Sequence, residues 1–165
     1  MFILKPLSFT TLAVLFALIF IGGYVSASGV GLTCPEWPLC PRGLLPHEDF
    51  VIEYIHRSVA ATTGMLVIAT MAFTLKSKAA PRGMKIASII AAGAVIGQIT
   101  LGAIVIVERL HAVLVTAHLG LGLVLFSMVL IIVLSAFRID NKRMKTREAS
   151  SNLSTQNNKT TATKS

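Results

Sequence analysis

The chain has 165 residues, of which 54% are hydrophobic and 13% are charged. This length fits one soluble domain, but the hydrophobic residues gather in long uninterrupted blocks, which excludes that class. The formal net charge of +8 comes from basic residues that flank these blocks. It therefore indicates a membrane topology and no nucleic-acid partner.

Four blocks are long enough to cross a bilayer, whose hydrocarbon core of about 30 Å requires roughly 20 apolar residues in a helix. They cover about 7–27, 50–75, 86–107 and 110–137, and Glu53 and Arg57 are the only Asp, Glu, Lys or Arg residues within them. The sequence thus predicts an all-α integral membrane protein, a bundle of four transmembrane helices in one domain over 1–138. The first block also resembles a signal peptide, but its apolar run is long for one, so we expect an uncleaved anchor.

The positions of the basic residues predict the orientation. Of the 15 Lys and Arg residues, all but Arg42, Arg57 and Arg109 lie near the N-terminus, in the 76–85 connection or in the tail from residue 138. The positive-inside rule therefore places both termini in the cytoplasm of a multi-pass plasma-membrane protein. The loop at about 28–50 is then extracellular. The tail over 139–165 has almost no apolar residues and is expected to be disordered.

The extracellular loop contains both cysteines of the chain, Cys34 and Cys40, in the stretch "CPEWPLC". An oxidising compartment allows a disulfide, and a turn can close this spacing. The pair then acts as a structural staple or as a redox-active couple. A metal site that also uses His47 is a third interpretation.

Two histidines fall inside predicted helices, where ionisable side chains are costly and usually functional. His56 is roughly 9 Å and His118 roughly 12 Å below the outer surface, at the helical rise per residue. Each is followed four residues later by a small residue, Ala60 or Gly122. A haem fits between two such helices, with one axial nitrogen from each side. Interhelical hydrogen bonds and a proton path are the alternatives.

Other polar and small residues in the spans have simpler interpretations. Glu53 and Arg57 have the i, i+4 spacing of an ion pair, although Arg57 is equally suited to a haem propionate. Gly93 and Gly97 predict a close-packing face on the third helix, and Gln98 predicts a hydrogen bond between helices.

Four motifs together resemble the haem A synthase family. They are "GLTCPEWPLC" (31–40), "EYIHR" (53–57), "QITLGAIVI" (98–106) and "HLG" (118–120), in the order found in that family, over about 22–125. The resemblance implies a membrane oxidoreductase that converts haem O to haem A by oxidising a ring methyl to a formyl group. It implies haem B as cofactor, with haem O able to occupy the same type of site.

The resemblance also implies roles for individual residues. His56 and His118 become the axial ligands of the haem iron, and Glu53 becomes the catalytic carboxylate. From its charge and position, and not from the resemblance, Arg57 is expected to help bind the haem cofactor through a propionate. Cys34 and Cys40, paired as a disulfide, hold a lid over the outer mouth of the pocket. The implied protein partners are a haem O synthase or a terminal oxidase.

One departure from the family pattern affects these expectations. The usual member has eight spans in two halves, and this chain resembles the first half alone. Because the reaction needs a cofactor haem and a substrate haem, we expect a homo-oligomer that combines sites. A b-type cytochrome or haem-binding protein without methyl oxidation is the alternative, followed by an assembly factor without haem. His111 is either a loop residue or an alternate ligand.

Overall fold

The computed structural model describes residues 3–32 and 51–162, with side chains described as far as Leu153. These ranges form α1 (Leu4–Ser28), a short 3-10 helix η1 (Val30–Leu32), α2 (Val51–Lys76), α3 (Arg82–Val107) and α4 (Ala112–Ala162). Four helices are long and apolar enough to cross a membrane. This result confirms the predicted all-α class and its four spans.

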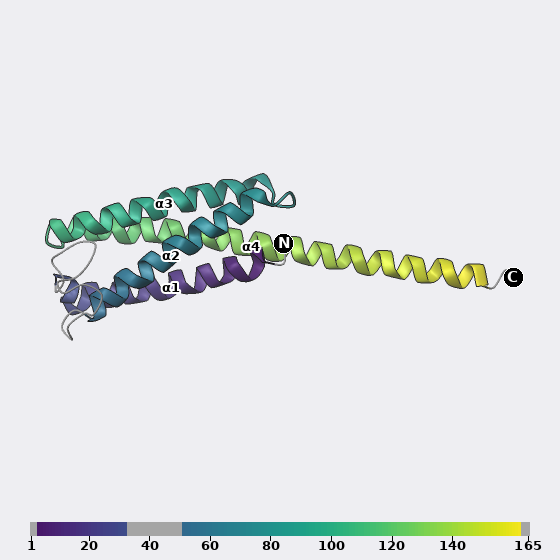
Figure 1. The fold of residues 1–165 in the computed structure, drawn as a ribbon, viewed down its shortest axis with the longest axis horizontal. Coiled ribbons are helices and arrows are strands. Elements are labelled where there is room, and N and C mark those ends of the chain that lie inside the picture. The colour runs from purple at the N-terminus through teal and green to yellow at the C-terminus, as the bar shows by residue number, and fades with distance from the viewer. Residues whose placement is uncertain (1–2, 33–50, 163–165) are drawn as a thin grey trace.

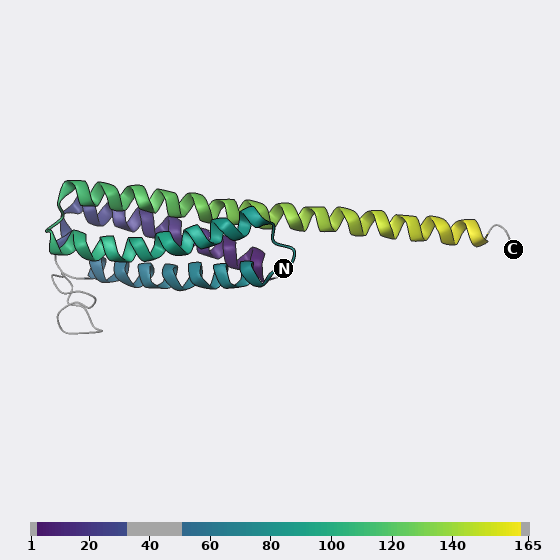
Figure 2. The same ribbon diagram turned by 90° about the horizontal axis from the view of Figure 1, so that it is seen from above.

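The four helices form an antiparallel bundle (Figure 1). α1 and α3 each pack against both α2 and α4, so α2 and α4 lie on a diagonal of the bundle. Figure 2 shows the start of α1, the α2–α3 connection and the extension of α4 at one end, which we call the basic end after Lys5, Lys76 and Arg82. The α3–α4 turn and η1 lie at the other, the histidine end, named after His56 and His118.

Proline and glycine define several helix ends. α1 begins at Leu4, before the predicted start at residue 7. Pro6 is compatible with this start because it lies in the first turn, where its missing N–H would have no partner within the helix. Gly29 ends α1 in the left-handed conformation, with φ of 74°. Pro81 precedes α3, which begins at Arg82 and not at residue 86.

α4 differs from the prediction for the C-terminal region. We expected a helix to about residue 137 and a disordered tail over 139–165, but the helix continues to Ala162 and projects from the bundle. Its side chains over 141–153 are exposed. Residues 142–148 include four Lys or Arg residues, which are good helix formers, and extending an existing helix is much easier than nucleating one.

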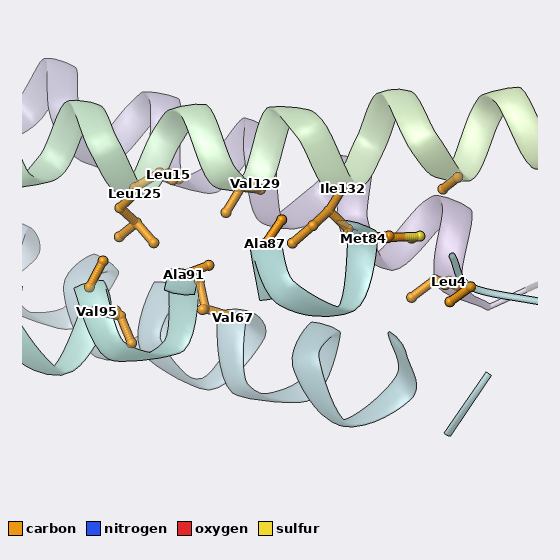
Figure 3. Close-up of a cluster of buried hydrophobic side chains, with 13 residues drawn as sticks. Leu4, Leu15, Val67, Met84, Ala87, Ala91, Val95, Leu125, Val129 and Ile132 are labelled. Atoms are coloured by element: carbon orange, nitrogen blue, oxygen red, sulfur yellow. The ribbon is translucent and has the colours of Figure 1, made fainter. Parts of the chain in front are cut away.

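The members of the core cluster lie in the half of the bundle nearer the basic end, and Figure 3 shows them at close range. Large side chains from all four helices meet there, each at most 2% exposed: Leu15, Val67, Met84, Leu125, Val129 and Ile132. α3 contributes mainly alanines to this core, which allow the other helices to approach closely.

Polar contacts join α1 to two neighbours. The hydroxyls of Thr11 and Thr70 share a buried hydrogen bond of 2.9 Å between α1 and α2. Lys5 Nζ lies 2.8 Å from Asp140 Oδ2 on α4 and 4.6 Å from the ring centroid of Phe137. These contacts fix the start of α1 against the bundle.

The outward surfaces of the helices are strongly apolar. Phe9, Phe16 and Phe20 on α1 are 57%, 62% and 75% exposed. A helix that is hydrophobic on its outer as well as its inner side belongs in lipid. The predicted extracellular loop with Cys34, Cys40 and His47 lies outside the described residues, so its disulfide stays a prediction.

The dense packing of α3 leads to a test with a matched control. Ala91 is 1% exposed in the core, whereas Ala61 on α2 is exposed. We expect Ala91→Leu to lower the free energy of unfolding by about 1–3 kcal/mol, because the added atoms have no space. Ala61→Leu should have almost no effect. Denaturant unfolding in detergent micelles measures both, and equal effects would contradict the packing described here.

Candidate functional site

His56 and His118 lie within the first two turns of α2 and α4, which both begin at the histidine end. His56 precedes the buried Val67 by 11 residues, and His118 precedes the buried Leu125 by 7 residues. These spacings are close to whole helical turns, so both histidines continue the inward-facing stripes of their helices. Because Val67 and Leu125 belong to one core cluster, the two stripes face the same interior.

A glycine on α1 accommodates the His56 ring. A Cβ atom added to Gly22 would lie 3.0 Å from Cε1 of His56, and 3.6 Å from its Nδ1. Contacts this short displace the neighbouring group, so only glycine leaves the imidazole in its present position. The adjacent Gly23 has nothing within 4 Å of an added Cβ.

The His118 ring has an equivalent position on the other side of the bundle. A Cβ atom added to Gly102 of α3 would lie 3.3 Å from Cε1 of His118. Gln98, one turn earlier on α3, donates a hydrogen bond of 2.7 Å from Nε2 to the His118 carbonyl oxygen. This bond confirms the predicted interhelical role of Gln98. The helix pairs α1–α2 and α3–α4 thus each hold one histidine against one glycine.

Both imidazoles have a buried nitrogen without a hydrogen-bond partner. Nδ1 of His56 and Nδ1 of His118 are each buried and unbonded. Over the described ranges, neither ring takes part in any hydrogen bond, so the arrangement does not favour the interpretation as interhelical hydrogen bonds. Leaving a buried polar atom unsatisfied is costly. Two imidazoles with unused nitrogens in an apolar interior are suited to ligate a metal centre.

Glu53 and Arg57 form the ion pair that their spacing predicted. Arg57 Nη2 donates to Glu53 Oε1 at 2.6 Å, and the two side chains are 14% and 4% exposed, respectively. Glu53 lies one turn closer to the end of the bundle than His56, on the same face of α2. A carboxylate and a guanidinium are therefore next to one of the two imidazoles.

The α3–α4 turn closes the bundle at this end. Arg109 and Leu110 have positive φ values of 49° and 62°, a conformation that costs energy for side chains other than glycine. In this turn the side chain of Leu110 packs against Gly31 of η1. A Cβ atom added to Gly31 would lie 3.3 Å from the Leu110 side chain. His111 follows in the turn and is exposed.

Some features of this site were missed by the sequence analysis. Gly22 and Gly102 were not recognised as the residues beside the imidazoles. Gly122 was expected to leave space beside His118, but it lies against Gln98. A Cβ atom added to Gly122 would be 3.4 Å from Nε2 of Gln98. A Cβ atom added to Gly97 would lie 3.1 Å from Leu121 of α4, as expected for close packing. A Cβ atom added to Gly93 would meet nothing within 4 Å. A glycine within a membrane helix indicates that another helix packs closely there, but it does not show which residue of that helix lies against it.

The fold and the site define a four-helix membrane protein with a pair of inward-facing histidines near one end. Residues 46–159 match the cytochrome oxidase assembly protein family (COX15-CtaA). The chain belongs to this family.

Individual relatives agree with this assignment. The chain is 35% identical over 137 residues to a protein named heme A synthase from Bacillus licheniformis, covering 81% of this chain and 45% of that protein. It is 32% identical over 120 residues to a heme A synthase from Staphylococcus aureus strain Newman, covering 71% of this chain and 39% of that protein. The chain spans less than half the length of these curated relatives.

The buried ion pair predicts a large effect of removing one partner. We expect Arg57→Gln to lower the free energy of unfolding by roughly 3 kcal/mol, because the nearly buried Glu53 carboxylate loses its neighbouring charge. The combined Glu53→Gln, Arg57→Gln variant should recover part of this loss. Arg138→Gln, at an exposed position, is the control and should change stability by less than about 0.5 kcal/mol. A loss no larger in Arg57→Gln than in the control would contradict a stabilising pair.

Proposed function

We propose that this chain binds haem through His56 and His118 and acts as a haem A synthase that converts haem O to haem A. The observation that carries the proposal is the matched seating of the two imidazoles, each against a glycine and each with a buried, unbonded Nδ1. Membership of the cytochrome oxidase assembly protein family supports the same function. The heme A synthases among its relatives suggest the reaction.

The surroundings of the histidines fit a haem better than a small metal ion. No group of three or more His, Cys, Asp or Glu side chains that would hold a metal ion occurs in the described ranges. A haem requires only two protein nitrogens, because its macrocycle supplies the other ligands of the iron. The apolar residues of the spans provide the surroundings that a macrocycle needs.

Glu53 and Arg57 have the chemistry to assist the reaction. A carboxylate next to a ligand histidine is able to accept protons as a methyl group is oxidised. A guanidinium in the same position is able to bind a propionate through paired hydrogen bonds. The ion pair between them holds both side chains within one helical turn of His56.

Haem B is the proposed cofactor and haem O the proposed substrate. Bound haem B would supply a redox-active iron, and the chain's own residues would hold it and exchange protons. Because one inward-facing histidine pair occurs in the described residues, we propose that a second copy of the chain supplies the second site. Gly97 packs against α4 within the bundle, whereas a Cβ atom added to Gly93 would meet nothing within 4 Å. We therefore propose the surface of α3 around Gly93 as the interface between copies.

The proposed setting follows the distribution of charge. The basic end, with Lys76, Lys78 and Arg82, would face the cytoplasm, and the histidine end would face outward across the plasma membrane. A disulfide between Cys34 and Cys40 would then lie over the site. A haem O synthase and a terminal oxidase are the proposed source of substrate and receiver of product.

Extraction of bound haem tests this proposal directly. The chain is expressed in a host that makes haem O but no haem A, and its haems are identified by chromatography and mass spectrometry. We expect haem A in the wild-type extract. Glu53→Gln should retain haem without forming haem A, whereas His56→Ala or His118→Ala should lower haem content at least roughly tenfold.

The control and the contrary outcomes are equally specific. His111→Ala removes an exposed histidine and should change nothing. Haem B or haem O without haem A would identify a haem-binding protein that does not oxidise the methyl group. Protein without any haem would overturn the assignment of both histidines.

The glycine beside His56 provides a further prediction. Gly22→Ala places a methyl group 3.0 Å from the ring, so the imidazole must shift by a few tenths of an ångström. We expect haem occupancy to fall roughly fivefold or more, from at least about 1 kcal/mol of strain. Gly23→Ala makes the same change at the next residue, in open space, and should leave the haem absorption spectrum unchanged. Equal spectra for the two variants would argue against His56 as a ligand.

A further inference from the structure

A groove of about 710 Å³ lies at the basic end, remote from the histidines. It is bounded by the start of α1, the end of α2 with the following turn, and α4 just beyond its apolar stretch. Its size is within the range of small-molecule sites in proteins. No residue of the proposed haem site contributes to it.

Three cations line this groove. Lys76, Lys78 and Arg143 all contribute, and no carboxylate is among its lining residues. Asp140, one turn before Arg143 on α4, is already bound to Lys5 at 2.8 Å. Within the described residues, none of the three cations forms an ion pair. Lys76 also balances the negative end of the α2 dipole, and Arg143 adds to the attraction that Lys5 exerts on Asp140.

The other walls of the groove are apolar. Ile3 and Phe73 line it and are 59% and 45% exposed, and Ile139 completes this side. The groove lies where the apolar part of α2 ends at Lys76 and that of α4 ends at Phe137. Charged groups on one side and large apolar side chains on the other, at a membrane boundary, match the two parts of a phospholipid.

We infer that this groove binds an anionic phospholipid, with its phosphate against Lys76, Lys78 and Arg143 and its acyl chains along Ile3, Phe73 and Ile139. Arginine and lysine together suit a phosphate, the former through paired hydrogen bonds and the latter as a point charge. The cationic lining favours an anionic headgroup over a zwitterionic one. The inference is independent of haem binding.

Lipid competition on the purified full-length chain tests this site. The protein in detergent receives equal amounts of phosphatidylglycerol and phosphatidylcholine with identical acyl chains, and native mass spectrometry measures the ratio of the two bound lipids. We expect phosphatidylglycerol to predominate. In the variant Lys76→Gln, Lys78→Gln, Arg143→Gln its excess should fall roughly 10- to 100-fold.

A matched variant distinguishes the groove from general positive charge. Lys142→Gln, Lys145→Gln, Arg147→Gln removes the same charge from exposed positions of α4 outside the groove. The bound ratio should stay at the wild-type value. An equal fall in both triple variants would overturn the site, as would a wild-type ratio near one.

Two further measurements keep the test decisive. If the groove variant does not fold, as judged by circular dichroism, the single variants Lys78→Gln and Arg143→Gln replace it and should each lower the ratio about fivefold. Inorganic phosphate should displace the lipid no better than chloride at the same ionic strength. Stronger displacement by phosphate would identify a free phosphate as the ligand and overturn the lipid assignment.

Discussion

Within a bilayer every polar group must find its partner inside the protein, and the rest of this structure depends on that constraint. Most polar side chains of the spans satisfy it locally. Thr63 and Thr74 donate to carbonyl oxygens one turn earlier, and Thr11 pairs with Thr70. Within the described residues, the buried Nδ1 atoms of His56 and His118 therefore depart from the pairing expected of buried polar groups.

The same constraint explains how the bundle is divided along its length. Hydrophobic burial does not hold helices together in lipid, so the half near the basic end is held by close packing of alanines against larger side chains. Near the histidine end, the inward positions include two imidazoles and the glycines beside them, together with Val25 and Val105. One half of the bundle is thus a packed support, and the other half positions groups able to bind a ligand.

Each histidine is placed by a helix other than its own. α1 provides Gly22 beside His56, and α3 provides Gly102 beside His118 together with the bond from Gln98. Since α2 and α4 are diagonal, the two histidines face one common interior only when all four helices pack together. The geometry proposed for haem binding is consequently a property of the bundle, and stabilising the packed half also stabilises the site.

The sequence by itself determined the four helices, because long apolar blocks in lipid have no alternative to helix. It also identified Glu53, His56, Arg57 and His118 as candidates, since ionisable residues in such blocks stand out, and their spacing predicted the Glu53–Arg57 pair. Only the tertiary structure decided that Gly22 and Gly102 lie beside the imidazoles and that Gly122 packs against Gln98. Helical periodicity gives the side of a helix on which a residue lies, but not which neighbour packs there. The continuation of α4 to Ala162 was likewise missed, because composition reports the lack of burial and not the persistence of a helix already formed.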